Sequence, residues 1–123
     1  MSTALNDVAS SAFLATGLAP ATQSGSVNGS TIDMITADGP CFAVQQVGSF
    51  SGDSLAGHIE ESANGSSWAA IDGAAFAEVT AGSNLQVIQF VRTARYVRYA
   101  ASIAGDTPSI AMAVLIGEQK KTL

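Results

Sequence analysis

The stretch that decides the fold is Ala94-Arg95-Tyr96-Val97-Arg98-Tyr99-Ala100-Ala101-Ser102-Ile103. Its side chains alternate, so that Tyr96, Arg98 and Ala100 share one face and Arg95, Val97, Tyr99 and Ala101 share the other. After the turn Gly105-Asp106-Thr107-Pro108, the return segment from Ser109 to Gly117 is apolar almost throughout. A half-exposed strand beside a strand buried on both faces is typical of a covered antiparallel sheet. The sequence therefore predicts a β-hairpin here, with the rest of the chain closing over it.

Further short strands are predicted on the N-terminal side of this hairpin. They are Thr31–Ile35 with Ile32 and Met34 on one face, Cys41–Val47 with Cys41, Ala43, Gln45 and Val47 on one face, Gly57–Ser62 with Ile59 inward, and Leu85–Arg92. Phe76 to Thr80 predicts a short strand or an irregular edge, and Gly48 to Gly57 a polar loop. About eight strands with turns every 8–12 residues or so predict an all-β fold, an antiparallel β-sandwich of jelly-roll type.

The expected organisation is one domain over residues 27–117, an N-terminal arm or linker over residues 1–26, and a polar C-terminal tail over residues 118–123. Within the arm, Asn6-Asp7 predicts the cap of a short helix through Phe13 and Leu14, which Gly17 ends. Leu18 to Ser26 then predicts an extended linker. The arm either orders against a neighbouring chain or is a disordered tail.

The composition argues against several classes of function. Charged residues make up 12% of the chain, about half the usual share, and the formal net charge is −5. Nucleic-acid binding is not expected, because a phosphate-binding surface needs an excess of Lys and Arg. No membrane span is expected, because the longest apolar run is far shorter than the ~20 residues of a transmembrane helix. So few charges indicate either a surface covered by partner protein or a monomer coated with serine and threonine.

The reactive side chains do not form a recognisable catalytic or metal-binding set. His58 is the single histidine and is expected at the surface, where Glu60 on the same strand face makes an ion pair possible. Cys41 lies in an apolar run and is expected to be a buried thiol. The aspartates lie mostly in turns, where they bond their own backbone. No enzyme activity, catalytic residue, cofactor or metal is therefore expected.

Three arginines lie close together on predicted strands. Arg92, Arg95 and Arg98 can each recognise a carboxylate, but Arg95 and Arg98 fall on opposite strand faces and cannot line one patch. The alternative is that they are solvated arginines whose stems cover Tyr96 and Tyr99.

Three segments together resemble a known family. They are Asn28-Gly29-Ser30-Thr31-Ile32-Asp33-Met34, then Gly57-His58-Ile59-Glu60-Glu61-Ser62-Ala63-Asn64-Gly65-Ser66-Ser67-Trp68, and Ala94-Arg95-Tyr96-Val97-Arg98-Tyr99 followed by Gly105 to Gly117. Their order is similar to small β-sandwich structural proteins of tailed bacteriophages, several of which are capsid decoration, or cement, proteins. The resemblance covers residues 27–117. Asn64 stands where a second aspartate is often seen in that family.

The resemblance implies a non-enzymatic protein of the virion, made in the cytoplasm of the host bacterium and located on the capsid exterior. Its implied partner is the major capsid protein, and it is implied to be a homo-oligomer, trimeric or otherwise symmetric, whose arm touches a neighbour. Similar Glu-Ser-x-x-Gly-x-x-Trp and Arg-Tyr-Val-Arg segments occur in discoidin-like carbohydrate-binding sandwiches. The alternative function is therefore such a module, with an adsorption role on the virion, in which Trp68, Tyr96 or Tyr99 would stack on sugars.

Overall fold

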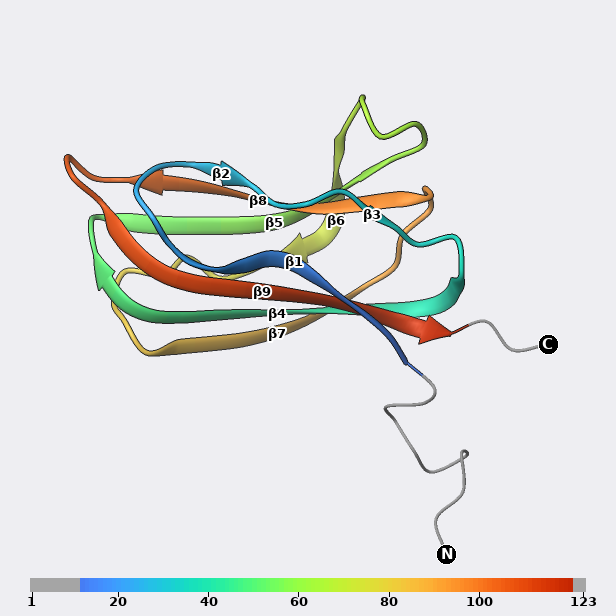
Figure 1. The fold of residues 1–123 in the computed structure, drawn as a ribbon, viewed down its shortest axis with the longest axis horizontal. Coiled ribbons are helices and arrows are strands. Elements are labelled where there is room, and N and C mark those ends of the chain that lie inside the picture. The colour runs from blue at the N-terminus through green and yellow to red at the C-terminus, as the bar shows by residue number, and fades with distance from the viewer. Residues whose placement is uncertain (1–11, 121–123) are drawn as a thin grey trace, which may run out of the picture.

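The structure is a computed structural model that describes residues 12–120. Within this range the regular structure is β-strand, with no helix (Figure 1). The strands are β1 (Ala12–Gln23), β2 (Val27–Asn28), β3 (Ile32–Asp33), β4 (Ala37–Ser51), β5 (Ser54–Ser62), β6 (Ala69–Ala75), β7 (Asn84–Phe90), β8 (Tyr96–Ala104) and β9 (Ser109–Lys120). The predicted all-β class is confirmed.

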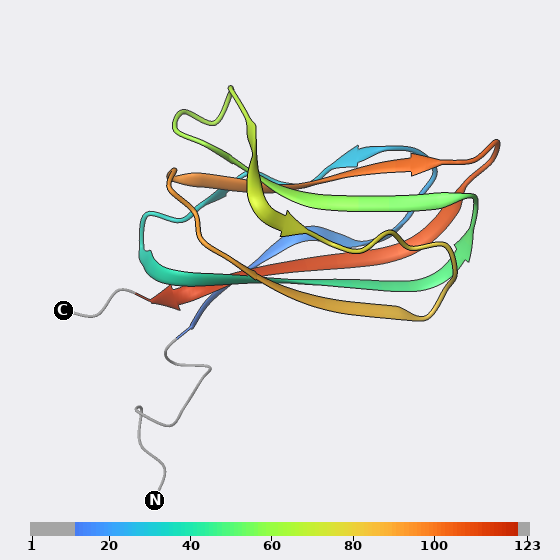
Figure 2. The ribbon, with the colours of Figure 1, turned by 180° about the vertical axis from the view of Figure 1, so that it is seen from behind.

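The strands form two antiparallel sheets, here called the β9 sheet (β1-β9-β4-β7) and the β8 sheet (β2-β8-β5-β6, with β3 also paired to β8). The pairings are nested along the chain: β1 pairs with β9, β2 and β3 with β8, β4 with β7, and β5 with β6. This nested ribbon is rolled up so that β9 also meets β4 and β8 meets β5. Such a roll is a jelly roll, so the predicted antiparallel sandwich is confirmed (Figures 1 and 2).

The predicted central hairpin is wrong in its pairing. β8 and β9 follow one another in the chain, but they lie in opposite sheets and are the inner strands of each. The connection at Gly105–Pro108 is therefore a corner between the sheets, and Gly105 has a φ of +138° there. Two adjacent strands that each bury one face can meet face to face across a sandwich as well as edge to edge, and the sequence pattern does not distinguish these arrangements.

The core lies between the sheets and is built from alternate residues of each strand. The alternation predicted for β4 and β8 is confirmed, and the structure shows that Cys41, Ala43, Gln45 and Val47 of β4 and Val97, Tyr99 and Ala101 of β8 face inward. Ile59 is inward as predicted, and Ile32 and Met34, predicted to share a face, are both buried. The largest fully buried side chains are Tyr99, Met34, Leu55, Ile59, Ile110, Ile116, Gln45, Glu118, Val47, Val79, Val97 and Val114. β9 is not buried on both faces as predicted, because Leu115 on its outer side is 39% exposed. Its apolar run therefore places apolar side chains at the surface.

The expected N-terminal boundary is wrong where the structure describes it. Residues 12–23 form β1, which pairs with β9 from Ala12↔Gln119 to Gln23↔Ile110, so neither the helix nor the linker predicted there exists. Residues 1–11 of the expected arm lie outside the described residues. β1 has the two register shifts of an irregular strand, one on each side of Leu18. A deletion of residues 1–26 would remove an entire strand of the sheet.

Two further boundaries differ from the prediction. β4 continues to Ser51 and β5 begins at Ser54, so most of the loop predicted from Gly48 to Gly57 is strand. Gly52, with a φ of +149°, allows the tight turn between them. β9 continues to Lys120, so the expected tail from residue 118 begins inside the sheet. In both places the strand depends on the pairing of β4 with β9, which are far apart in the chain. The local sequence therefore does not predict it.

Candidate functional site

The outer face of the β9 sheet is apolar. The register places Thr16, Leu115, Val44 and Val87 in one row across the four strands, and Leu14, Gly117, Phe42 and Gln89 in the next. We call this surface the uncharged face. Its outward residues are Leu14, Thr16, Pro20, Phe42, Val44, Gln46, Gly48, Leu85, Val87, Gln89, Ala111, Ala113, Leu115 and Gly117, none of which carries a charge.

Several large apolar side chains on the uncharged face are open to solvent. Leu85 is 65% exposed, Val87 62% and Leu14 56%. In a protein whose net charge is −5, a continuous surface of this kind with no titratable group is typical of a protein contact. Sequence reasoning identified the alternation over Leu85–Arg92 but not which side faced solvent, because both sides contain apolar residues.

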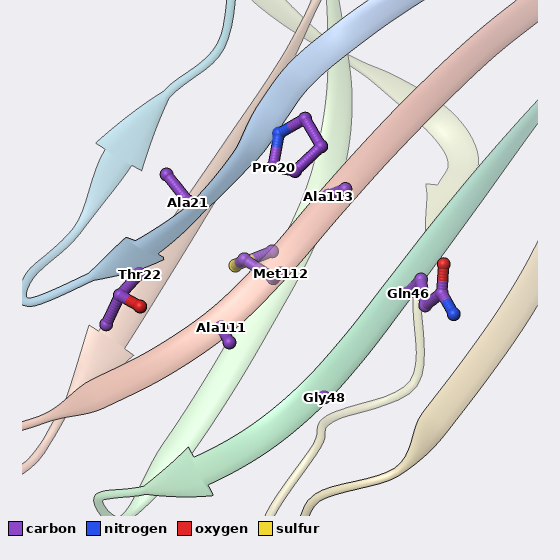
Figure 3. Close-up of a pocket in the computed structure, with 8 residues that line it drawn as sticks. All are labelled: Pro20, Ala21, Thr22, Gln46, Gly48, Ala111, Met112 and Ala113. Carbon is purple, nitrogen blue, oxygen red and sulfur yellow. The ribbon is translucent and has the colours of Figure 1, made fainter.

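Small residues hollow the middle of the uncharged face. Two open hollows, of about 290 Å³ and about 270 Å³, lie along β1, β9 and β4, and Pro20, Gln46 and Ala113 line both. Figure 3 shows the first of them, where Ala111 and Ala113 of β9 lie between Pro20 and Thr22 of β1 and Gln46 and Gly48 of β4. The methyl groups of the alanines are too short to fill this space, and Gly48 has no side chain. The hollows contain no charged or convergent polar groups, so they suit apolar side chains of a partner more than a small polar ligand.

The outer face of the β8 sheet, in contrast, carries charged side chains. Glu60 of β5 accepts a hydrogen bond from Nε of Arg98 at 2.8 Å, and its other oxygen lies 3.1 Å from Nε2 of His58. Burial alone would raise the pKa of Glu60, but the hydrogen bonds from Arg98 and His58 hold the pKa below its ordinary value. The contact between His58 and Glu60 that the sequence made possible is present. Arg98 and Glu60 thus form an ion pair on the β8 sheet, whereas none of the residues that define the uncharged face carries a charge.

The three arginines each bind a different carboxylate. Arg92 pairs with Glu118, Arg95 with Asp33 and Arg98 with Glu60, so they do not form one basic patch. The guanidinium of Arg95 lies 5.1 Å from the ring centre of Tyr96, as expected for a covering stem. Arg98 covers Trp68 at 4.5 Å and not Tyr99, which is fully buried. Sequence reasoning missed the Arg92–Glu118 pair, because it assigned Glu118 to a solvated tail.

The aromatic residues that could stack on a sugar are already engaged. Tyr99 is in the core, where its ring contacts Phe76 edge to face with 6.1 Å between ring centres. One face of Trp68 and one face of Tyr96 each carry a guanidinium. Each guanidinium occupies a ring face on which a sugar could otherwise stack.

The residues that could carry reactive chemistry are dispersed. Cys41 is buried on β4 as expected, and its Sγ donates to Oε2 of Glu118 at 3.2 Å. His58 lies on the outside of the other sheet. Within residues 12–120, no group of three or more His, Cys, Asp and Glu side chains is placed to hold a metal ion. Nor does the described part of the chain contain a helix long and apolar enough to cross a membrane.

Cys41 is expected to be chemically inert in the folded protein. Burial, together with the hydrogen bond to the Glu118 carboxylate, raises the pKa of the Cys41 thiol to about 12, so almost no thiolate exists at pH 8. An aromatic disulfide reagent should label the folded chain very slowly and the urea-unfolded chain at once. Because the unfolded thiol has a pKa of about 8.5, the unfolded state ionises first, and this group should lower stability as the pH rises from about 8.5 towards 12. Labelling of the folded chain at the rate of a free thiol would contradict the buried position.

Comparisons of this chain with known family models, with curated proteins and with solved structures find no match. The surfaces of the molecule are therefore the guide to its function.

Proposed function

We propose that this protein is a non-enzymatic structural protein of a bacteriophage virion. It decorates the capsid from outside and stabilises it by binding the lattice of the major capsid protein through the uncharged face. The observation that carries the proposal is that face: a continuous outer sheet surface of apolar and small neutral residues, on a chain whose charges lie elsewhere.

The character of this face suits a lattice partner. Decoration requires that many identical copies bind identical sites by shape and area, with no reaction at the site. Exposed Leu85 and Val87 supply apolar area, and the hollow between Pro20 and Gln46 accepts protruding side chains. The paired charges of the β8 sheet remain free to face solvent and keep the decorated particle soluble.

The arrangement of the aromatic rings favours this proposal over the carbohydrate-binding alternative. Sugar-binding sandwiches present open aromatic faces, whereas here Tyr99 is buried and guanidinium groups lie over Trp68 and Tyr96. The proposal also agrees with the resemblance of residues 27–117 to decoration proteins of tailed phages.

Replacing Leu115 with lysine is expected to weaken binding to capsids at least about tenfold, since it buries an unpaired charge in the contact. Leu115 lies on an inner strand in the middle of the uncharged face. The measurement is co-sedimentation of the full chain with expanded capsids assembled from the major capsid protein encoded with it. Leu115→Lys should remain folded, because the side chain is 39% exposed and its stem can snorkel to solvent.

The matched control is Ser102→Lys, which adds the same charge on the outer side of β8, an inner strand of the opposite sheet. This variant should co-sediment as the wild type does. Equal binding by Leu115→Lys and wild type would exclude the uncharged face, and loss of binding by Ser102→Lys alone would move the contact to the β8 sheet. Failure of wild type to bind any capsid, together with hits on a glycan array, would replace the proposal with the carbohydrate-binding one.

A further inference from the structure

The sandwich has four outer strand edges, and three of them are protected against pairing with another chain. β1 contains Pro20, which has no N–H to donate, and the carbonyl of its Gly17 already accepts from the N–H of Ser30. β2 and β3 have only two residues each. β6 contains Asp72 and Gly73, the latter with a φ of +78°, and its pairing with β5 has a register shift. Proline, charge, bulges and short length are the usual protections of edge strands.

β7 has none of these protections. Its seven residues, Asn-Leu-Gln-Val-Ile-Gln-Phe, contain no charge, proline or glycine, and they pair with β4 without a register shift. β7 ends the order of the β9 sheet, and in Figures 1 and 2 it forms the lower margin of the sandwich, with no described strand beyond it. The contacts of Gln86 with the N–H and carbonyl of Ala77 use its side chain and leave the edge backbone unused.

We propose that β7 is a self-association edge, at which two copies of this chain pair antiparallel about a twofold axis. The four-stranded β9 sheets of the two copies then form one continuous sheet. Backbone hydrogen bonds across the edge provide the attraction, as in β-augmentation. This inference rests on the edge itself and is independent of what the uncharged face binds.

The register of β7 allows a second copy to pair along the whole length of this edge. Residues opposite each other in a sheet point to the same face, so Leu85, Val87 and Gln89 must oppose outward residues of the second copy. The twofold axis therefore lies midway between a residue and its own copy on the other chain, and not between two successive residue pairs. Centring it on Val87, the midpoint of β7, pairs all seven residues, with Val87 opposite Val87 and Leu85 opposite Gln89.

Charge also favours self-pairing at this edge. Copies with a net charge of −5 repel one another on average, but β7 and the uncharged face beside it carry no charge. The pair of sheets joins two uncharged faces into one surface. An edge of seven residues is small, below the roughly 1,000 Å² of a stable interface, so the dimer should be reversible and should depend on concentration.

The first test is sedimentation velocity of the full chain over a range of concentrations. We expect a monomer–dimer equilibrium that Val87→Lys weakens at least about tenfold, because two lysines then face each other at the axis. Val87 is 62% exposed, so the variant should keep the melting temperature of the fold within a few degrees. Ser102→Lys, with the same added charge on the opposite sheet, should dimerise as wild type does.

The second test determines the register between the two β7 strands from which cysteine variants form a disulfide. In Val87→Cys the two new thiols are directly opposed, with Cβ atoms about 4.5–5.5 Å apart, at the upper limit of disulfide geometry. Because the dimer is reversible and the two edges can adjust, oxidation should give a covalent dimer. In Leu85→Cys the thiols are four residues out of register, about 13 Å apart, and should cross-link far less. The native Cys41 is buried and should not interfere. A chain that stays monomeric at high concentration, a trimer, or a dimer that Val87→Lys leaves unchanged would overturn the proposal.

Discussion

Replacing Arg92 with alanine is expected to destabilise the folded chain by about 3–5 kcal/mol, the cost of breaking a buried ion pair from one side. Nε of Arg92 donates to Oε1 of Glu118 at 2.8 Å, and Glu118 is 1% exposed. The same guanidinium donates to the carbonyls of Ala94, Met34 and Ala37 at 2.8–2.9 Å. One side chain thus connects β9, the turn before β4 and the loop before β8. Alanine would leave a buried carboxylate and three carbonyls without this donor.

The measurement is urea unfolding followed by the fluorescence of Trp68, the single tryptophan. Arg95→Ala is the matched control, because it also removes an arginine bound to a carboxylate, at 2.7 Å from Asp33. That pair is exposed, with 46% and 40% of the two side chains open to solvent, so its loss should leave the unfolding midpoint close to that of wild type. If Arg92→Ala and Arg95→Ala unfold at the same urea concentration, Arg92 does not organise this end of the sandwich.

A double variant separates loss of the pair from loss of its unpaired member. Arg92→Met combined with Glu118→Leu leaves no charge buried, so it should be more stable than Arg92→Ala alone. The three carbonyls that Arg92 served would still lack their donor, and recovery should therefore be partial.

The position and alternation of a strand could be predicted from the sequence where its two faces carry different kinds of side chain. In Cys41–Val47 the predicted division into two faces is confirmed: Cys41, Ala43, Gln45 and Val47 are all buried, and the residues between them lie on the other side of the strand. The turn at Asn64-Gly65 was also readable. The Asn64 side chain accepts from the N–H groups of Ser66 and Ser67, and Gly65 has a φ of +79°.

The strands that were missed are those that depend on a distant partner. Residues 12–23 contain Gly17, Pro20 and several alanines, which give weak strand signals, and they form β1 only because β9 offers a long edge to pair with. Likewise, the sequence around Glu118 is typical of a polar tail. In the structure, however, Glu118 accepts a hydrogen bond from Arg92, which lies 26 residues earlier in the chain. Such contacts are properties of the closed sandwich and have no local sequence signature.

The candidate surface was missed for a related reason. A run such as Ile110–Ile116 is apolar at every position, so it indicated burial on both sides, yet its outward side is the uncharged face. The low share of charged residues left two alternatives open, a surface covered by partner protein or a monomer coated with serine and threonine. The register of β1, β9, β4 and β7 shows that uncharged residues of these four strands lie together on one sheet face.

The core is packed tightly over Gly57, on an inner strand of the β8 sheet. The hydroxyl of Tyr99 donates to Oε1 of Gln45, and this hydrogen bond crosses between the sheets directly above the glycine. A Cβ atom on Gly57 would lie 2.2 Å from the Tyr99 hydroxyl oxygen and 2.5 Å from Oε1 of Gln45. Both side chains are fully buried, and Nε2 of Gln45 has no hydrogen-bond partner within the described residues.

Gly57→Ala is therefore expected to cost about 3 kcal/mol, the upper part of the range for overpacking, because neither neighbour has space to retreat. Gly48→Ala is the control: it is also a strand glycine, its Cβ would meet Ala111 at ordinary distances of 3.7–3.9 Å, and it should be neutral or slightly stabilising. Tyr99→Phe alone should cost about 1–3 kcal/mol, since it leaves the Gln45 amide wholly unpaired. Added to Gly57→Ala, however, it removes the colliding hydroxyl, so the double variant should lose less stability in urea than the sum of the two single losses. Additive losses would mean that the clash is relieved by a shift of the β5 backbone and not by the tyrosine.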